Sequence, residues 1–378
     1  MIESIDLDLA DDEWQPPLTL SGKAWVLVRS GRHVLGEARV VGLSPSELFE
    51  HRTRLLRTYA PRLVSTRSEV LDGSQVTIVV CTRDRPRLLE GCLMAISSQE
   101  PKCAEIVVVD NAGTNPLTRD IAESFDAIVV AEPSAGLDRA RNAGFRAASR
   151  PIVAYVDDDA RVDRYFSGAL GAAFRSPQIQ VVTGLVLPAE LDTFAQRAFE
   201  EIEGGMRKGF SPSIFERRRV GLQAFRVGVG TNMAFRRQLL EELGGFDPRF
   251  DVGTSIRGAG DLDMFWRCLN AGIAIVYDPN VLVRHIHRRD RLGLLHQMRD
   301  NGMAYSAFLE SRRTEWPELA GAVNRERWRW HLSRHVMRPI AALLRGRFLE
   351  VQMALSELGG SRHGAAALRQ ETFRTQTP

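Results

Sequence analysis

The feature that most constrains this chain is an apolar run that ends in three acids, because residues 152–159 read IVAYVDDD. The apolar part has the length of a buried strand, and Asp157, Asp158 and Asp159 follow it directly. Adjacent carboxylates repel one another unless a divalent cation or hydrogen-bond donors lie between them. Hard ions such as Mg²⁺ or Mn²⁺ take such oxygen ligands and often bridge them to substrate phosphates. The run therefore predicts a metal-bound phosphate compound at the end of a sheet; the alternative is a solvated acidic loop.

Composition indicates the broad class of protein. Of 378 residues, 44% are apolar and 26% charged, and the net charge is +3. These values predict a soluble globular protein of about two domains and give no reason to expect nucleic-acid binding. The four cysteines lack C-x-x-C spacing and are expected to be thiols. Because we find neither a secretory signal nor a membrane-spanning stretch, we expect a cytoplasmic protein, peripheral at the inner face of the membrane.

From residue 76 the pattern alternates between strands and helices. Strands are expected at 76–81, 105–109, 127–131 and 152–156, with helices at 87–99, 117–124 and 136–149. Short loops between such elements predict parallel βαβ units, whose ligands bind beyond the carboxyl ends of the strands. Polar clusters at 82–84, 110–111 and 157–159 fall at these ends.

The chain divides into three expected parts. Residues 1–70 predict a small α+β appendage, with a loose arm at 1–20, two strands within 23–43 and a helix at 45–60. Residues 76–310 predict an α/β domain with a mainly parallel, Rossmann-like sheet flanked by helices, including later strands at 181–187, 229–235 and 273–277. Residues 311–378 predict a helical C-terminal tail.

Two further segments suggest nucleotide binding. Asp110 follows a strand and could accept a hydrogen bond from the imide N–H of uracil or thymine, although D-N-A-G is also good turn chemistry. Arg141 and Asn142 lie in the helix that starts near residue 136, and helix N-termini favour phosphates. The alternative for the second group is an exposed helix face with paired charges.

Carboxylates and histidines also occur late in the domain. Asp261 and Asp263 follow a Gly-rich loop at a helix start, where a mobile loop can present a general base to a hydroxyl group. Helix capping is the alternative explanation. His285 and His287 share one face of a strand, and one histidine could complete a metal site with the aspartates. An exposed histidine pair is the plain alternative.

Taken together, these motifs resemble the family 2 glycosyltransferases, which are inverting enzymes with the GT-A fold. The matching segments, in order between about residues 76 and 309, are VTIVVCTRDRP, EIVVVDN, GLDRARNAGFRAA, VAYVDDDARVD, GTNMAFRRQLLEELGGFD, GDLDMFWRCLNAGIAIVYDP and VRHIHR. The small N-terminal part is similar to extensions of some actinobacterial members.

The resemblance implies roles for matching residues. The implied donor-binding residues are Thr82, Asp84, Asp110, Arg141, Asn142, Asp157 and Asp158, with Thr82 and Asp110 at the base. The implied metal ligands are Asp157 and Asp159 of a D-x-D element, together with His285, which is implied as a contact to the metal or to the diphosphate.

On the acceptor side, the resemblance implies Asp261 as the catalytic base and Gly245 and Phe246 as part of the wall. The commonest form of the base motif has a glutamate before this aspartate, where the chain has Gly260. Asp263 therefore stays a second candidate for the base.

The implied reaction moves a sugar from a nucleoside-diphosphate sugar to a hydroxyl of a saccharide or lipid-linked acceptor, with Mn²⁺ or Mg²⁺ as cofactor. One displacement at the anomeric carbon would invert its configuration while Asp261 takes the proton. Two alternatives stay open. A nucleotidyltransferase usually needs a Gly-rich loop after the first strand, where this chain reads CTRDRP; a non-catalytic sugar-nucleotide-binding protein would fit the Gly260 departure.

The tail carries a basic amphipathic pattern. Residues 325–347 read RERWRWHLSRHVMRPIAALLRGR, with Trp328, Leu332 and Val336 at helical spacing. Such a segment predicts weak contact with an anionic membrane surface. The alternative is that the apolar stripe packs on the catalytic domain, and Pro339 is expected to break the helix.

Overall fold

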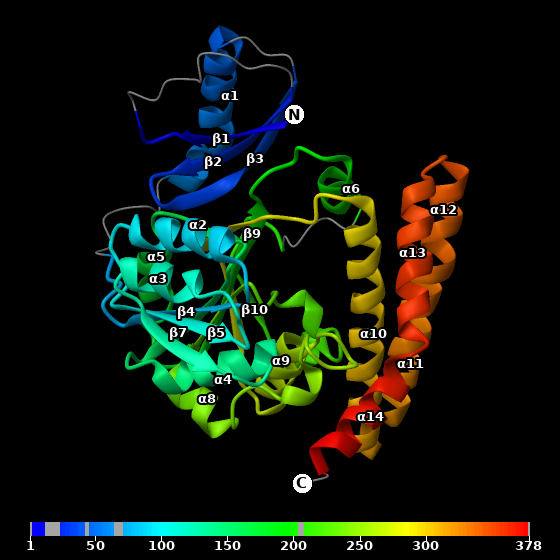
Figure 1. Cartoon of the computed structure of the whole chain (residues 1–378). Coiled ribbons are helices and arrows are strands. Elements are labelled where there is room, and N and C mark those ends of the chain that lie inside the picture. Colours follow the sequence, from blue (N-terminus) through cyan, green and yellow to red (C-terminus); the bar gives the residue numbers. More distant parts are fainter. Residues whose placement is uncertain (1, 12–22, 42–44, 64–70, 203–207, 377–378) are drawn as a thin grey trace.

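The N-terminal appendage is a three-stranded sheet covered by a helix (Figure 1). The computed structural model describes residues 2–11, 23–41, 45–63, 71–202 and 208–376. The elements are β1 (Ile2–Asp8), β2 (Lys23–Ser30), β3 (His33–Val41) and α1 (Pro45–Leu63). β1 runs parallel to β2, so the expected loose arm is wrong for residues 2–8. The reason is an alternation that places Ile5 and Leu7 in a core with Val26 and Leu55; residues 12–20 of the expected arm lie outside the described residues.

The central sheet begins with the expected βαβ units. The strands β4 (Val76–Thr82), β5 (Glu105–Asn111), β6 (Ile128–Glu132) and β7 (Ile152–Asp157) are parallel in the order β7-β4-β5-β6. The helices of this half are α2 (Pro86–Ser97), α3 (Leu117–Ser124), α4 (Leu137–Ala147) and α5 (Phe166–Ala173). Apolar side chains of α2, α3 and α5 pack on one face of the sheet and those of α4 on the other. The carboxyl ends of β4, β5 and β7 therefore meet at one edge.

The second half makes the sheet mixed. Its strands are β8 (Ala160–Val162), β9 (Val181–Pro188), β10 (Ser213–Phe215), β11 (Asn232–Arg236) and β12 (Ile275–His285). The full order among the described residues is β10-β12-β9-β11-β7-β4-β5-β6, with β8 on β12 and β11 antiparallel to both of its neighbours. The short helical elements are α6 (Phe194–Ile202), α7 (Arg217–Val220), η1 (Ala224–Arg226), α8 (Arg237–Glu242), η2 (Pro248–Phe250) and α9 (Gly260–Asn270). The expected helix-flanked α/β sheet is confirmed as a mixed sheet, in which β12 is parallel to β9 and antiparallel to β8.

The C-terminal part is helical, as expected. It comprises α10 (Arg291–Glu315), η3 (Pro317–Leu319), α11 (Ala320–Trp330), the π-helical η4 (His331–Met337), α12 (Arg338–Leu344), α13 (Phe348–Ser361) and α14 (Gly364–Gln376). Pro339 lies in the first turn of α12, which needs no backbone N–H, so the expected break is wrong. α13 packs along α10, and the two helices approach closely at Gly360. A methyl group there would lie 1.8 Å from the Arg299 carbonyl oxygen, so this approach requires glycine. Across the described helices, none combines the length and apolarity that a bilayer crossing requires.

The appendage is joined to the central sheet by polar contacts. Both terminal nitrogens of Arg29 donate to the Asp163 carboxylate, at 3.0 and 2.9 Å, and both side chains are buried. Asp6 of β1 pairs with Arg284 of β12, and the Val34 amide donates to Asn280 Oδ1 at 2.9 Å. The appendage is thus connected to the strand that ends at His285.

Candidate active site

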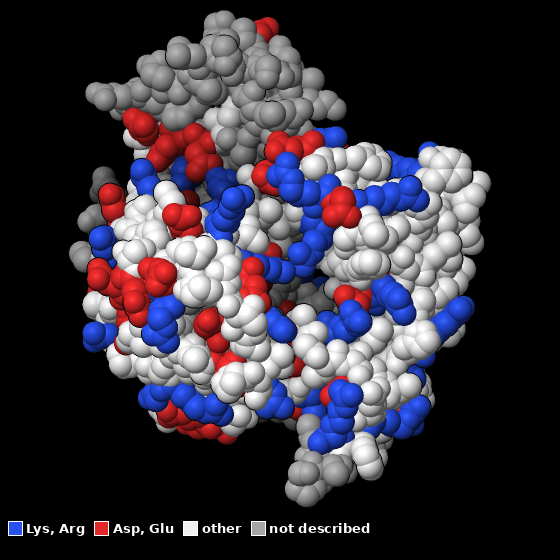
Figure 2. Space-filling view, viewed as in Figure 1, with Lys and Arg blue, Asp and Glu red and all other residues white. Residues whose placement is uncertain are grey.

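A cavity of about 1310 Å³ lies at the carboxyl ends of β4, β5 and β7. Its lining on the sheet side includes Thr82, Asn111 and the three acids at the end of β7. The facing wall comes from α10, α11 and η4, with Tyr305 and Trp328 among its residues. Figure 2 shows a hollow between the sheet domain and the C-terminal helices, bordered by blue and red side chains. The cavity is large enough to hold two substrates of ordinary size.

The acids after β7 converge on His285. Ligand atoms of Asp157, Asp159 and His285 all lie within 4.8 Å of one another. His285 Nε2 donates to Asp159 Oδ1 at 3.1 Å, and the Ile286 amide donates to the Asp159 carbonyl at 2.9 Å. On its other ring nitrogen, His285 Nδ1 lies 3.1 Å from Nδ1 of His287. Two carboxylates and an imidazole at this spacing fit Mn²⁺ or Mg²⁺, with room for ligands from a bound phosphate compound.

The electrostatics of this cluster follow from burial. Burial, followed by the charge of Asp159, raises the pKa of Asp157. For Asp159 burial also acts upward, but the hydrogen bond and charge of His285 outweigh it and lower the pKa. For His285 burial acts downward, but the hydrogen bond and charge of Asp159 outweigh it and raise the pKa. The contact between Asp159 and His285 therefore favours the charged form of each group.

Asp158 faces away from His285. Thr82 Oγ1 donates to Asp158 Oδ2 at 2.7 Å, and Arg85 Nη1 donates to Oδ1 at 3.2 Å. Burial raises the pKa of Asp158 to about 6 in spite of Arg85. Thr82 and Asp158 thus tie the first strand to the acid cluster. Sequence reasoning did not single out Arg85, which also lies 3.6 Å from Asp159 Oδ2; its position after a strand end, among acids, was the available signal.

Asp261 stands at the start of α9 and lines the cavity. Its Oδ2 accepts from the Gly230 amide at 2.8 Å and its Oδ1 from the Leu262 amide at 2.9 Å. The preceding Ala259 has φ +81°, a left-handed conformation that is strained for a residue with a side chain. Each carboxylate oxygen keeps a second lone pair, so Asp261 can still accept a proton from a molecule in the cavity.

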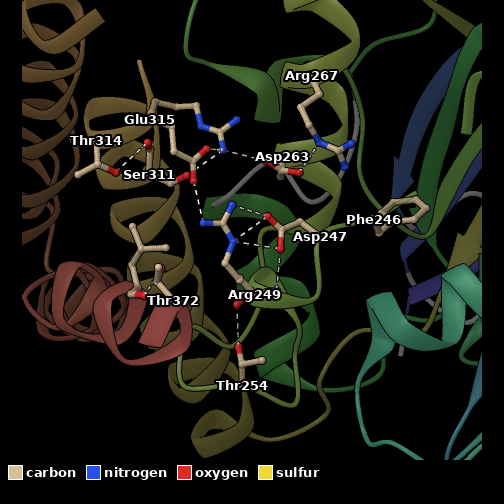
Figure 3. Close-up of polar contacts among 12 residues, drawn as sticks. Phe246, Asp247, Arg249, Thr254, Asp263, Arg267, Ser311, Thr314, Glu315 and Thr372 are labelled. Carbon is tan, nitrogen blue, oxygen red and sulfur yellow. Dashed lines mark hydrogen bonds and ion pairs between the residues drawn. The ribbon is translucent and has the colours of Figure 1, made fainter. Parts of the chain in front are cut away.

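Asp263 is not among the residues that line the cavity. Its Oδ1 accepts from Arg312 Nη2 at 2.9 Å and its Oδ2 from Arg267 Nε at 2.7 Å, deep in the protein (Figure 3). The Arg312 guanidinium in turn lies 4.4 Å from the Trp266 ring and 4.6 Å from the Trp316 ring. Oδ1 of Asp263 therefore joins α9 to α10, whereas Oδ2 pairs with Arg267 within α9.

Arg141 lines the cavity, whereas Asn142 does not. Asn142 Nδ2 donates to the Phe246 carbonyl at 2.8 Å, and its Oδ1 accepts from the Phe246 amide at 2.7 Å. The Phe246 side chain is buried in the core, and Gly245 lies against Asn142 at φ +75°. The structure thus does not bring Asn142, Gly245 and Phe246 into the cavity; they fix α4 to the turn after α8.

The start of α4 was expected to bind phosphate, but a side chain occupies it. Asp251 Oδ2 accepts from the amides of Asp138 and Arg139 at 3.1 and 3.3 Å. This carboxylate satisfies the free N–H groups that an anion would otherwise bind. Asp251 lies more than a hundred residues along the chain, so no local sequence pattern indicated the contact.

Asp84 and Asp110 lie at the sheet edge, just beyond the cavity lining. Asp84 Oδ1 accepts from the amides of Thr114 and Asn115 at 2.7 and 2.9 Å and thereby fixes the loop after β5. These backbone hydrogen bonds, Thr114 first, lower the pKa of Asp84. Asp110 Oδ1 is buried and, among the described residues, has no hydrogen-bond partner, and burial raises its pKa.

Comparison with known proteins gives the family. The sequence profile of "Glycosyl transferase family 2" matches residues 77–244. Residues 77–244 are a family 2 glycosyltransferase domain. The match covers the expected βαβ units and the acid cluster, and Asp261, His285 and the C-terminal helices lie beyond it.

Relatives of this glycosyltransferase domain are distant. A "Pre-mycofactocin glycosyltransferase" of Mycobacterium tuberculosis is 25% identical over 218 residues, 56% of this chain and 43% of that protein. A "Glucosyl-dolichyl phosphate glucuronosyltransferase" of Haloferax volcanii is 24% identical over 183 residues, 46% of this chain and 56% of that protein. The chain thus spans about half the length of these curated relatives.

Among solved structures, the chain is similar to a mannosyltransferase from Pyrobaculum calidifontis in complex with GDP-Man and Mn²⁺. The identity is 20%, the TM-score 0.49, and the alignment covers 85% of this chain and 87% of that chain.

Proposed function

We propose that the protein is a metal-dependent, inverting glycosyltransferase that moves a sugar from a nucleoside-diphosphate sugar to an acceptor hydroxyl. The observation that carries the proposal is that one cavity holds both the Asp157–Asp159–His285 cluster and the Asp261 carboxylate. The family 2 match over residues 77–244 supports the class of reaction.

In the proposed reaction the donor lies along the sheet edge, with its diphosphate at the acid cluster. Asp157, Asp159 and His285 would hold Mn²⁺ or Mg²⁺. The bound cation would supply charge neutralisation for the departing diphosphate. Thr82 at the end of β4 and Asp110 near the end of β5 would bind the nucleotide base. Arg85 would add positive charge beside the acids.

Asp261 is the proposed base. The acceptor hydroxyl attacks the anomeric carbon, the bond to the diphosphate breaks, and the hydroxyl proton passes to Asp261. A single displacement inverts the configuration at that carbon. The two backbone amides on Asp261 hold its carboxylate toward the cavity. Asp263 has no such role in the proposal, because two arginines engage it outside the cavity.

The first test is a thermal-shift panel of UDP-, GDP- and dTDP-sugars with Mn²⁺, followed by assays of sugar release and transfer with the best donor. A donor at a hundredfold excess over its Kd should stabilise the fold by about 3 kcal/mol. Asp261→Asn should bind that donor normally and lower kcat by about 10²–10⁴-fold. Asp120→Asn, an exposed carboxylate on α3, is the matched control. A stabilising donor that wild-type protein neither hydrolyses nor transfers would favour the non-catalytic alternative.

We propose that the acceptor is reached at an anionic membrane surface. Trp328, Leu332, Val336, Ile340 and Leu344 recur every four residues through α11, η4 and α12, and all are exposed, Leu344 by 84%. Trp328 and Leu332 also line the cavity, so the apolar stripe continues to its mouth. The expected alternative, in which the stripe packs on the catalytic domain, finds no support in this exposure.

The charge around the stripe suits an anionic surface. Between residues 325 and 349 there are seven arginines, and the single acid of this span, Glu326, is buried. Four of the arginines pair with glutamates outside the span, and Arg325, Arg329 and Arg345 add further positive charge. Figure 2 shows largely white surface over α12 and α13, with blue side chains at its borders. Apolar side chains with arginines beside them are typical of segments that lie at the headgroup level.

Co-sedimentation with phosphatidylglycerol-containing vesicles tests this surface. Wild-type protein should pellet at low salt and less at high salt, and Leu344→Glu should reduce the bound fraction about tenfold. Leu117→Glu, on exposed α3, is the matched control. Absence of pelleting, together with a dimer in light scattering that Leu344→Glu abolishes, would make the stripe a contact between two copies instead.

A further inference from the structure

Asp138, in the first turn of α4, is a buried carboxylate that the reaction above does not use. It is 1% exposed and belongs to the lining of the cavity. Its Oδ1 accepts from Arg141 Nη1 at 2.9 Å, whereas its Oδ2 has no hydrogen-bond partner in the described part of the chain. Burial raises the pKa of Asp138 well above its ordinary value, against the effect of Arg141. An unsatisfied buried oxygen is costly, so its retention calls for a reason.

The Asp138 carboxyl occupies the space in which a side chain at residue 260 would begin. A methyl group on Gly260 would lie 1.8 Å from Asp138 Oδ2 and 2.4 Å from Oδ1, distances that no pair of nonbonded atoms tolerates. Gly260 directly precedes Asp261 in the chain. The carboxylate next to the proposed base therefore comes from α4 instead of α9.

Arg141 binds this carboxylate and lies near Asp261. A methyl group on Gly230 would lie 2.6 Å from Arg141 Nη2 and 3.3 Å from Asp261 Oδ2, and the Gly230 amide donates to that same oxygen. The guanidinium thus reaches from Asp138 toward Asp261. The charges of Asp138, Asp157 and Asp261 outweigh burial and raise the pKa of Arg141, so the cation is permanent.

We propose that Asp138 is a positioning residue for Asp261. By binding Arg141 on one side, it keeps the guanidinium from closing on the Asp261 oxygens that must receive the acceptor proton. Because Gly260 has no side chain, it leaves the space that the Asp138 carboxyl occupies. This role rests on the glycosyl transfer proposed above.

The geometry offers an exchange experiment. Asp138 Oδ1 lies 2.4 Å from the position that a Cβ atom at residue 260 would occupy. This is about the distance between Cβ and a carboxylate oxygen within one aspartate side chain. An aspartate at residue 260 could therefore place an oxygen where Arg141 now finds Asp138 Oδ1, once Asp138 is shortened. The four variants are Asp138→Asn, Asp138→Ala, Gly260→Asp and the double change Asp138→Ala/Gly260→Asp. Each is measured for kcat, for donor KM and for unfolding temperature.

Asp138→Ala should lower kcat by about 10²-fold with little change in donor KM, since a misdirected group slows the step without weakening donor binding. Asp138→Asn should fall between it and wild type, because an asparagine keeps an oxygen that can accept from Arg141 and replaces the other oxygen with an amide group. Gly260→Asp alone should unfold earlier, because its side chain meets Asp138. The double variant should unfold later than Gly260→Asp alone and regain about tenfold in kcat over Asp138→Ala, which is the coupling expected of groups in contact.

The outcomes distinguish the positioning role of Asp138 from the proposed glycosyl transfer. Recovery of unfolding temperature without recovery of kcat would make Asp138 a packing residue and overturn the positioning role. Full activity in Asp138→Ala would overturn it as well. A wild-type protein that transfers no sugar from any donor would remove the proposed function, whereas an active wild type with an unrestored double variant would remove only the role of Asp138.

Discussion

Asp263 and Asp261 are two positions apart, yet the structure predicts opposite consequences when each carboxylate is changed. We expect Asp263→Ala to damage stability and to spare the chemistry. The Asp263 and Arg312 side chains are each only 1% exposed, and their ion pair at 2.9 Å joins α9 to α10. Burial lowers the pKa of Arg312 in spite of Asp263 and Glu315, which indicates how costly this cation is to bury.

The magnitude follows from what Asp263→Ala leaves behind. Removing one member of a buried pair costs about 3–5 kcal/mol, because the other charge stays buried. Arg312 would keep Ser311 at 2.8 Å and Glu315 at 3.4 Å, as well as the indole rings of Trp266 and Trp316. We therefore expect the lower end, about 3 kcal/mol. Asp263→Asn keeps an acceptor for one arginine and should cost about 1–3 kcal/mol.

Urea unfolding followed by tryptophan fluorescence is the assay, because Trp266 and Trp316 flank Arg312 and report on this contact. Asp263→Asn should unfold at lower urea and retain kcat per folded molecule, whereas Asp261→Asn should unfold as wild type does and lose kcat. The reasoning is refuted if Asp263→Asn unfolds at the wild-type urea concentration while its kcat collapses. The base would then be Asp263, and the buried pair would have to open during catalysis.

Three further results are expected. Asp159→Ala should abolish the Mn²⁺-dependent thermal shift given by the best donor, since it removes one of the three clustered ligands; a surviving shift would contradict the metal assignment. Burial lowers the pKa of Lys208 from 10.5 to about 8. Between these pH values the unfolded chain binds more protons than the folded one, so the free energy of unfolding rises with pH. This contribution, roughly 3 kcal/mol in full, should disappear in Lys208→Met, and identical pH dependence of urea unfolding in both proteins would count against it. Asp251→Ala should cost about 1–2 kcal/mol in urea unfolding, because it frees the amides of Asp138 and Arg139 at the start of α4, and an unchanged midpoint would show that the cap is dispensable.

Local pattern was enough to predict the first half of the sheet and the acid cluster. The runs that form β4, β5 and β7 are apolar, have strand length and end in polar residues. His285 is the last residue of β12, and His287 follows that strand. What the sequence could not indicate were contacts between distant segments. Asp251 at the start of α4, Asn142 on Phe246 and Asp138 over Gly260 each join residues about a hundred or more positions apart. β1 was missed because its alternation is short and its acids suggested a solvated arm.

The two sides of the cavity come from different parts of the chain, and this determines how substrate specificity can change. The floor with the acid cluster belongs largely to residues 77–244, which the family shares, whereas Trp328, Leu332 and Met337 of the facing wall lie outside that match. If the proposed function holds, we expect substitution or exchange of the C-terminal helices to change the acceptor and to leave the donor chemistry in place. A chimera that joins this sheet domain to the tail of another member would show which part of the chain selects the acceptor.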